Sequence, residues 1–258
     1  MQTTLGFRLN SRVTAPGIGI ANPIPIPPMP SGLQQLHLIR RGAGISRWDR
    51  VSYNSKGFVP SEGIEFTDTS AVSPLRFDRI DMEMPITYDT GFTFGIVHTI
   101  NDDPGENFTV ATSRDYSNSQ ERGFEIELRY LNDRREYRFN VGTQQGWRQF
   151  GSNRDDPVEG NRIGFLAVSD QGDLSWHMPH SNRFATGTLE GSGTNPAPDA
   201  GIRLLSQVFI DPENLPNPSQ GYSVSAVMMW NRALSQAESQ AAYDGLKPWL
   251  AQYDLDIH

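Results

Sequence analysis

Apolar and polar residues alternate along several stretches of the chain, which is the pattern of β-strands with one buried face and one solvated face. The alternation predicts strands at 80–84, 92–96, 124–130 and 137–141, and further strands are expected at 162–169, 174–178, 202–210 and 222–230. Asn132 and Asp133 predict a hairpin turn between the third and fourth of these stretches. Polar loops rich in Gly and Pro separate the others. Many short strands joined by turns favour an all-β sandwich or jelly roll.

One helix is predicted, near the C-terminus. Ser235 followed by Glu238 is the pattern of a capping box, and the residues after it are good helix formers. Gly245 is expected to end this helix, and Pro248 is expected to open a last short turn that carries Trp249.

The N-terminal residues differ in composition from the rest of the chain. Six prolines fall between residues 16 and 30, interleaved with isoleucines. Prolines lack a backbone N–H and favour an extended polyproline II conformation, so this segment is neither a helix nor a central strand. We expect an arm that docks on a neighbouring subunit or partner, with a plain spacer as the alternative. The residues expected to make the assembly contact are Ile18, Ile20, Pro23, Ile24, Pro25, Ile26, Pro27 and Pro28.

These patterns divide the chain into three parts. Residues 1–31 are the extended arm, residues 32–65 are a small connecting region of β-structure and turns, and residues 66–258 are the main β-domain.

Composition narrows the classes of function. The 258 residues carry a net charge of −8 and give a pI of about 5.1, which disfavours nucleic acid as a partner. Cysteine is absent, so disulfides, thiolate metal sites and thiol nucleophiles are excluded. We expect no secretory signal and no membrane insertion, because no charged N-terminal region precedes an apolar run and no stretch approaches about 18 apolar residues.

Residues 222–246 run from a predicted strand through Met229-Trp230-Asn231-Arg232-Ala233-Leu234-Ser235 into the capped helix. This segment resembles the closing signature of the laminin G-like, concanavalin A-like jelly-roll superfamily, which is also found in bacteriophage tail and other virion proteins. Residues 91–94 are similar to an early core strand of that family, and residues 162–176 are similar to its central hairpin.

The resemblance covers roughly residues 66–253. It implies an all-β, concanavalin A-like antiparallel jelly-roll sandwich, here with an extended Pro-rich N-terminal arm and one short C-terminal helix. It also implies a role in binding sugars or proteins. No particular ligand follows, because the same fold hosts lectins, adhesion modules, polysaccharide hydrolases and lyases, and viral structural proteins.

Glu125 and Glu127 are the strongest candidates for catalysis. They lie on one face of a predicted strand, so their Cα atoms are about 7 Å apart, within the range of glycosidase carboxylates. The family's glycosidases carry a Glu-x-Asp-x-x-Glu strand, whereas this chain has Glu127 in place of the Asp and Tyr130 in place of the last Glu. Charged residues on the facing strand favour an ordinary solvated face. We therefore expect no enzyme activity.

Binding residues are expected in two places. Trp147, beside Arg148, could stack on a sugar ring between a hairpin and a Gly-rich loop, although a core position is the alternative. Asp102 and Asp103 lie in an acidic loop, either as a solvated turn or as oxygen ligands for calcium. His177 and His180 have a metal-ligand spacing, but Pro179 between them argues against a shared face. No metal site and no cofactor are expected.

A jelly roll without a signal peptide or cysteine suggests assembly in a bacterial cytoplasm and release in a particle. We therefore expect a bacteriophage virion structural protein, most simply a fibre-like or receptor-binding component of the tail or adsorption apparatus. Its expected partners are other virion proteins, copies of itself in a homo-oligomer such as a trimer, and a host surface glycan. The alternatives are a capsid decoration protein, a polysaccharide-active enzyme and a free carbohydrate-binding module.

Overall fold

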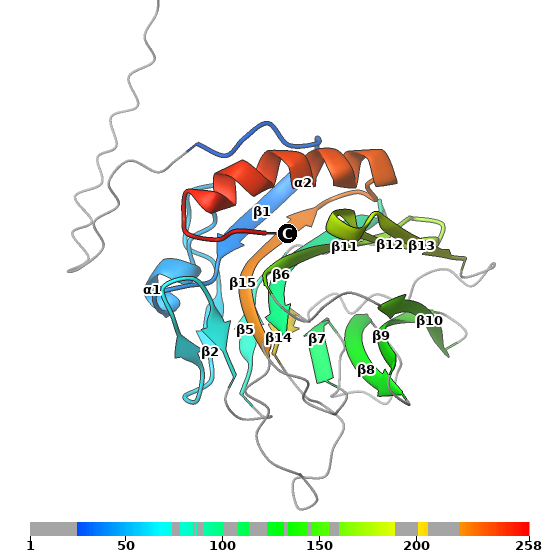
Figure 1. Ribbon diagram of the computed structural model, residues 1–258, viewed down its shortest axis with the longest axis horizontal. Helices are drawn as coiled ribbons and strands as arrows, with labels where there is room; N and C mark the ends of the chain where they lie inside the picture. Colours follow the sequence, from blue (N-terminus) through cyan, green and yellow to red (C-terminus); the bar gives the residue numbers. More distant parts are fainter. Residues whose placement is uncertain are drawn as a thin grey trace, which may run out of the picture.

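Two antiparallel β-sheets, packed face to face, make up the computed structural model of the chain (Figure 1). The structure describes residues 25–73, 78–84, 86, 90–100, 108–113, 123–131, 134–143, 146–154, 160–188, 201–205 and 222–257. Within these residues the eight-stranded sheet has the strand order β13-β12-β11-β6-β15-β4-β3, with β1 also paired to β15. The seven-stranded sheet has the order β10-β9-β8-β7-β14-β5-β2.

The strands of the eight-stranded sheet are β1 (Leu33–Leu38), β3 (Glu65–Phe66), β4 (Ala71–Val72), β6 (Phe92–Ile100), β11 (Arg162–Val168), β12 (Leu174–Met178), β13 (Arg183–Gly187) and β15 (Tyr222–Trp230). Those of the seven-stranded sheet are β2 (Phe58–Pro60), β5 (Ile80–Met82), β7 (Phe108–Thr112), β8 (Phe124–Leu131), β9 (Arg134–Thr143), β10 (Gly146–Arg154) and β14 (Ile202–Leu204). The helices are α1 (Ala43–Ser46), the 3₁₀ turn η1 (Pro179–Ser181) and α2 (Gln236–Ala251).

The expected antiparallel sandwich with one C-terminal helix is confirmed. Strands β12 and β15 occupy the predicted ranges, and the predicted hairpin is the β8–β9 pair. Strands β1, β10 and β13 were not predicted individually, because their sequences lack a clean alternation of apolar and polar residues.

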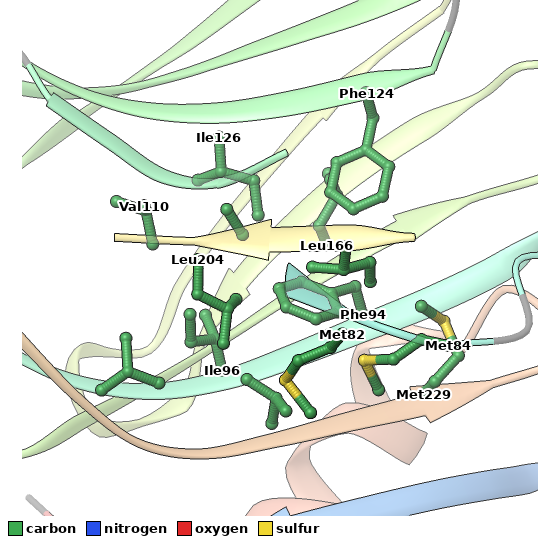
Figure 2. Close-up of a cluster of buried hydrophobic side chains, with 14 of the residues drawn as sticks. Met82, Met84, Phe94, Ile96, Val110, Phe124, Ile126, Leu166, Leu204 and Met229 are labelled. Carbon is green, nitrogen blue, oxygen red and sulfur yellow. The ribbon is translucent and has the colours of Figure 1, made fainter. Parts of the chain in front are cut away.

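The main core lies between the two sheets, and Figure 2 shows part of it. Alternate residues of each strand point inward, which is why the period-two pattern predicted these strands. Phe94 of β6 and Phe124 of β8 meet across the sandwich, with ring centroids 5.8 Å apart. Farther along, Trp176 of β12 has its ring centroid 4.8 Å from that of Phe139 and 5.2 Å from that of Tyr137, both on β9.

A second core lies between the outer face of the eight-stranded sheet and α2 (Figure 1). Its members include Phe165 and Trp230 from the sheet and Leu246, Trp249 and Leu250 from the helix. Because this sheet is covered on both faces, its central strands are buried throughout, and all seven residues of β11 are buried.

The prediction that Gly245 ends the helix is wrong, because α2 continues through Gly245 and Pro248 to Ala251. Packing outweighs the local signals here, since Trp249 and Leu250 beyond them are almost fully buried against the sheet. The N-terminal arm passes close to the helix at this point, since a Cβ atom at Gly245 would lie 3.4 Å from the carbonyl oxygen of Pro28, at ordinary contact distance.

The described part of the arm, Pro25–Ser31, runs along α2 of its own domain (Figure 1). Ile26 and Met29 pack against the second core. The indole N–H of Trp230 donates a hydrogen bond to the carbonyl oxygen of Pro30 at 3.3 Å. Of the expected assembly residues, those from Pro25 to Pro28 therefore lie beside their own domain. Ile18, Ile20, Pro23 and Ile24 are outside the described residues.

Residues 32–65, expected to form a connecting region, contribute to both sheets. β1 pairs antiparallel with β15, and β2 pairs with β5 at the edge of the seven-stranded sheet. Asp49 stabilises the loop between them, because its carboxylate accepts hydrogen bonds from the backbone N–H of Leu36, Val51 and Ser52. This part of the chain is thus integral to the sandwich.

Candidate ligand-binding pocket

A pocket of about 330 Å³ opens at one end of β11, β12 and β13. This volume is within the range of roughly 300–1,000 Å³ that small-molecule sites occupy. The residues that line it are Ala167, Ser169, Asp173, Leu174, Ser175, Thr186, Gly187, Thr188, Ala233 and Leu234. It therefore combines hydroxyl groups and one carboxylate with small apolar side chains.

The hydroxyl groups come from adjacent strands. Ala167, Ser175 and Thr186 are successive partners in one cross-strand row, and Thr188 follows the end of β13. Within the described part of the chain, the hydroxyls of Ser175, Thr186 and Thr188 make no hydrogen bond to another protein group. A hydroxyl is both a donor and an acceptor, so this wall offers three free hydrogen-bonding groups to a ligand.

The turn from β11 to β12 forms a second, well-ordered wall. The backbone N–H of Ser169 donates to the carbonyl oxygen of Asp173 at 2.8 Å, and the N–H of Asp173 donates to the Ser169 hydroxyl at 2.9 Å. Gly172 has a φ of 86°, a conformation that glycine adopts without steric cost. These bonds fix the backbone of Asp173 at the edge of the pocket.

The segment between β15 and α2 forms the third wall, and it is part of the sequence that resembles the jelly-roll signature. The buried Thr93 hydroxyl donates to the carbonyl oxygen of Arg232 and accepts from the N–H of Leu234, at 2.9 and 2.8 Å. Leu234 is 3% exposed. The apolar side of the pocket is therefore held to β6 by a single threonine.

The same wall is fixed to the start of α2. Arg232 donates two hydrogen bonds to the Glu238 carboxylate, at 2.7 and 3.1 Å, and Glu238 also completes the predicted capping box with Ser235. The Arg232 hydrogen bonds, followed by that from the Ser235 backbone, lower the pKa of Glu238 to about 2. Arg232 is thus engaged away from the pocket. None of the described lining residues is Lys, Arg or His, so Asp173 carries the only full charge among them.

A second polar surface crosses the outer face of the seven-stranded sheet. The strand register places Asp81, Arg203, Thr112, Glu125, Asn140 and Gln149 in one row across six strands. Arg203 donates to the Asp81 carboxylate at 2.9 Å. Burial raises the pKa of Asp81, but hydrogen bonds from Arg203 and Arg79 outweigh it, so the pKa lies below its ordinary value.

The two glutamates in this surface are engaged by neighbouring side chains. Glu125 is 1% exposed, and its carboxylate accepts hydrogen bonds from Thr109 at 3.1 Å and from Asn140 at 3.3 Å. Glu127 pairs with Arg138 across the β8–β9 hairpin at 4.0 Å. The cross-strand pairing predicted for this face is confirmed at the Glu127–Arg138 pair, but the prediction of a solvated face is wrong at Glu125, which is buried.

The two histidines of the possible metal pair lie in β12 and η1. His177 is 1% exposed, neither of its ring nitrogens has a hydrogen-bond partner in the described part of the chain, and its ring packs edge-on against Phe184. Burial, followed by the nearby His180, lowers the pKa of His177. Among the described residues no group of three or more metal-ligating side chains is assembled.

None of the residues predicted to bind ligand is among the described residues that line this pocket. Trp147 and Arg148 lie in the edge strand β10, where their backbones pair with Gly142 and Val141 of β9. Their side chains, and all of Asp102 and Asp103, are outside the described residues. Sequence reasoning missed Ser175 and Thr186 because alternation marks an outward side chain without showing which strand lies beside it.

The chain was compared with known proteins. No protein-family model and no curated protein sequence matches it. Solved structures do match. The receptor-binding domain of botulinum neurotoxin D has a TM-score of 0.62 and 11% identity, and the match covers 83% of this chain and 53% of that one. The botulinum neurotoxin type G receptor-binding domain has a TM-score of 0.61 and 10% identity, over 84% of this chain and 52% of that one.

The binding domain of Paraclostridial Mosquitocidal Protein 1 is similar to the same degree, with a TM-score of 0.61 and 11% identity over 83% of this chain and 52% of that one. This chain thus spans about half the length of each of these domains. Among the described residues, no helix is both long and apolar enough to cross a membrane. At identities this low the comparison establishes the fold alone, and that fold is the β-sandwich of these receptor-binding domains.

Proposed function

We propose that this protein is a non-catalytic binding domain of a bacteriophage virion, located in the tail or adsorption apparatus, and that its sandwich contacts a receptor on the host surface. The observation that carries the binding role is the pocket at the end of β11–β13, where one carboxylate and three hydroxyls that have no partner among the described residues line a space of about 330 Å³. A site of this kind favours hydrogen bonding to a ligand.

Binding is favoured over catalysis by the burial of Glu125, the first of the two candidate catalytic glutamates. A general acid or base has to come within hydrogen-bond reach of the substrate. Glu125 is almost fully buried, and its two carboxylate oxygens are held by Thr109 and Asn140. The solved structures with the same fold support this choice, because they are receptor-binding domains, one of them determined in complex with N-acetylneuraminic acid.

The virion role rests on the N-terminal arm. Residues 25–31 lie along α2, and they are preceded by 24 further residues with the same Pro- and Ile-rich character towards their end. Proline restricts the unfolded chain, so such a segment loses less entropy when it is ordered by a partner. We assign residues 1–24 to attachment, to other virion proteins or to copies of this chain in a closed oligomer such as a trimer.

The test compares the full chain with a chain that begins at Pro25 and so keeps the segment that packs on α2. Light scattering with and without virion proteins measures assembly, and retention on bacterial cell envelopes measures receptor binding. We expect both chains to bind envelopes and only the full chain to assemble. If light scattering shows that both chains are monomers with and without virion proteins, the attachment role is overturned. If neither chain binds any envelope tested, the receptor role is overturned.

A further inference from the structure

We infer that the pocket at the end of β11–β13 accepts an uncharged sugar residue and rejects acidic sugars. This inference rests on the receptor-binding function proposed above and names the ligand class of the same site. If the ligand preference of the structural neighbours applied to this chain, the opposite would be expected, because the ligand seen in one of them, N-acetylneuraminic acid, is an acidic sugar.

The polar groups of the pocket match a polyhydroxylated ligand. Ser175, Thr186 and Thr188 can each donate one hydrogen bond and accept others, whereas the Asp173 carboxylate only accepts. A sugar hydroxyl can donate to Asp173 and exchange hydrogen bonds with the three side-chain hydroxyls at the same time. Hydrogen bonds to a charged group are the stronger ones, so Asp173 is the expected anchor.

The apolar groups of the pocket match the remainder of such a ligand. Ala167 and Leu234 line the pocket beside the hydroxyls and give it an apolar side, whereas the side chain of Leu174, a third lining residue, belongs to the main core between the sheets. The C–H groups on one face of a sugar ring need such a surface. A free polar ion, which has no apolar face, would gain nothing from it.

Charge sets the selectivity. No described lining residue is basic, and the nearest arginine along the chain, Arg232, is bound by both oxygens of Glu238. A carboxylate or sulfate group in this pocket would therefore face Asp173 without a compensating cation, and losing its water shell there would be unfavourable.

The pocket is also organised before a ligand arrives. Hydrogen bonds within the Ser169–Asp173 turn hold one wall, and Thr93 holds the other through Arg232 and Leu234. A site with fixed walls loses little entropy on binding and discriminates between ligands by shape and charge.

The test uses the full chain and two sets of oligosaccharides, one ending in neutral hexoses and one ending in sialic or uronic acids, alongside retention on bacterial envelopes. Asp173→Asn removes the negative charge of the pocket, and Ser175→Ala and Thr186→Val remove two of its hydroxyls, all with little change of shape. Asp170→Asn and Ser55→Ala are matched controls, because both residues are exposed and neither lines the pocket.

We expect binding of a neutral oligosaccharide that weakens at least tenfold in Asp173→Asn and is unchanged in both controls. Asp173→Lys should admit acidic oligosaccharides, whereas Asp170→Lys, which changes net charge equally, should not. Preferential binding of acidic sugars by the unmodified chain would overturn the inference. The inference would also be overturned if all three pocket variants still bound bacterial envelopes. In that case the proposed receptor binding would hold, but it would use a different site. Absence of any envelope binding would instead remove the proposed function on which the inference rests.

Discussion

His98 and Tyr137 connect the two sheets through a hydrogen bond of 2.6 Å between the Nε2 atom of the histidine and the phenolic hydroxyl. His98 belongs to β6 and Tyr137 to β9, and both are fully buried. The bond lies beside Trp176, in a region otherwise filled by aromatic rings. It therefore contributes a directional link between two sheets that hydrophobic packing alone would hold less specifically.

Tyr137→Phe should lower the free energy of unfolding by about 1–3 kcal/mol, because it removes a partner of a buried histidine nitrogen while keeping the ring. Chemical denaturation measures the change. Tyr53→Phe is the control, since Tyr53 is 49% exposed, and it should shift the free energy by less than about 0.5 kcal/mol. Equal effects of the two substitutions would contradict a stabilising link between the sheets.

Gly164→Ala should destabilise the sandwich by about 1–3 kcal/mol or more, because the β11 backbone at this position lies directly against a rigid ring. A Cβ atom there would come within 2.1 Å of a ring carbon of Trp176, which is itself fully buried. Gly44→Ala in α1 is the opposite case, with open space around the new methyl group. For Gly44→Ala, thermal unfolding should show that the free energy of unfolding rises by up to about 1 kcal/mol, because alanine has a higher helix propensity than glycine.

The Arg232–Glu238 pair should make stability depend on pH in acid. The folded-state pKa of Glu238 is about 2, below its ordinary value of 4.5, so the unfolded chain binds the proton more readily. The contribution of this ion pair to the free energy of unfolding is complete above about pH 4.5 and is lost as the pH falls towards 2. Glu238→Gln should reduce the free energy of unfolding by about 1 kcal/mol at pH 7, with the difference shrinking near pH 2. Glu62→Gln, at an exposed glutamate, should change the free energy of unfolding at pH 7 by less than about 0.5 kcal/mol. A difference between Glu238→Gln and the unmodified protein that persists at pH 2 would count against the assignment.

His177 should make stability depend on pH nearer neutrality. Its pKa is lowered by burial and by His180, so protonation favours the unfolded chain, and stability falls as the pH drops below the ordinary value of 6.5. His177→Leu removes this penalty together with two buried ring nitrogens for which the described residues offer no hydrogen-bond partner. Relative to the unmodified protein, the variant should gain up to about 1.4 kcal/mol between pH 7.5 and 5.5. Parallel pH profiles in denaturant titrations would show that His177 does not titrate in this way.

The segment Pro25–Ser31 should stabilise the domain on which it packs. A chain that begins at Gly32 loses the contacts of Ile26 and Met29 and the carbonyl groups that accept hydrogen bonds from Trp230 and Arg232. Its free energy of unfolding should be about 2–4 kcal/mol lower than that of a chain that begins at Pro25. Calorimetry on the two truncated chains decides the point, and identical unfolding temperatures would mean that the segment adds no stability.

Local pattern by itself determined the strands that have one buried face and the start of the helix. Phe124, Ile126 and Leu128 alternate with charged residues because one side of β8 packs in the core, and Ser235 with Glu238 caps α2 because both residues lie within one turn. Such signals depend on neighbours only two to four residues away, so they survive in a single sequence.

Tertiary structure decided what depends on distant residues. Helix α2 continues past Gly245 and Pro248 because its apolar side chains pack on a sheet of eight strands that come from separate parts of the chain, and the arm lies on that helix because Ile26 and Met29 pack against the same second core. The candidate pocket needs Ser175, Thr186 and Leu234 side by side, although the first two come from neighbouring strands and the third lies more than 45 residues later. Pairing between strands and the placement of the segment after β15 bring them together, and no spacing along the sequence records that arrangement.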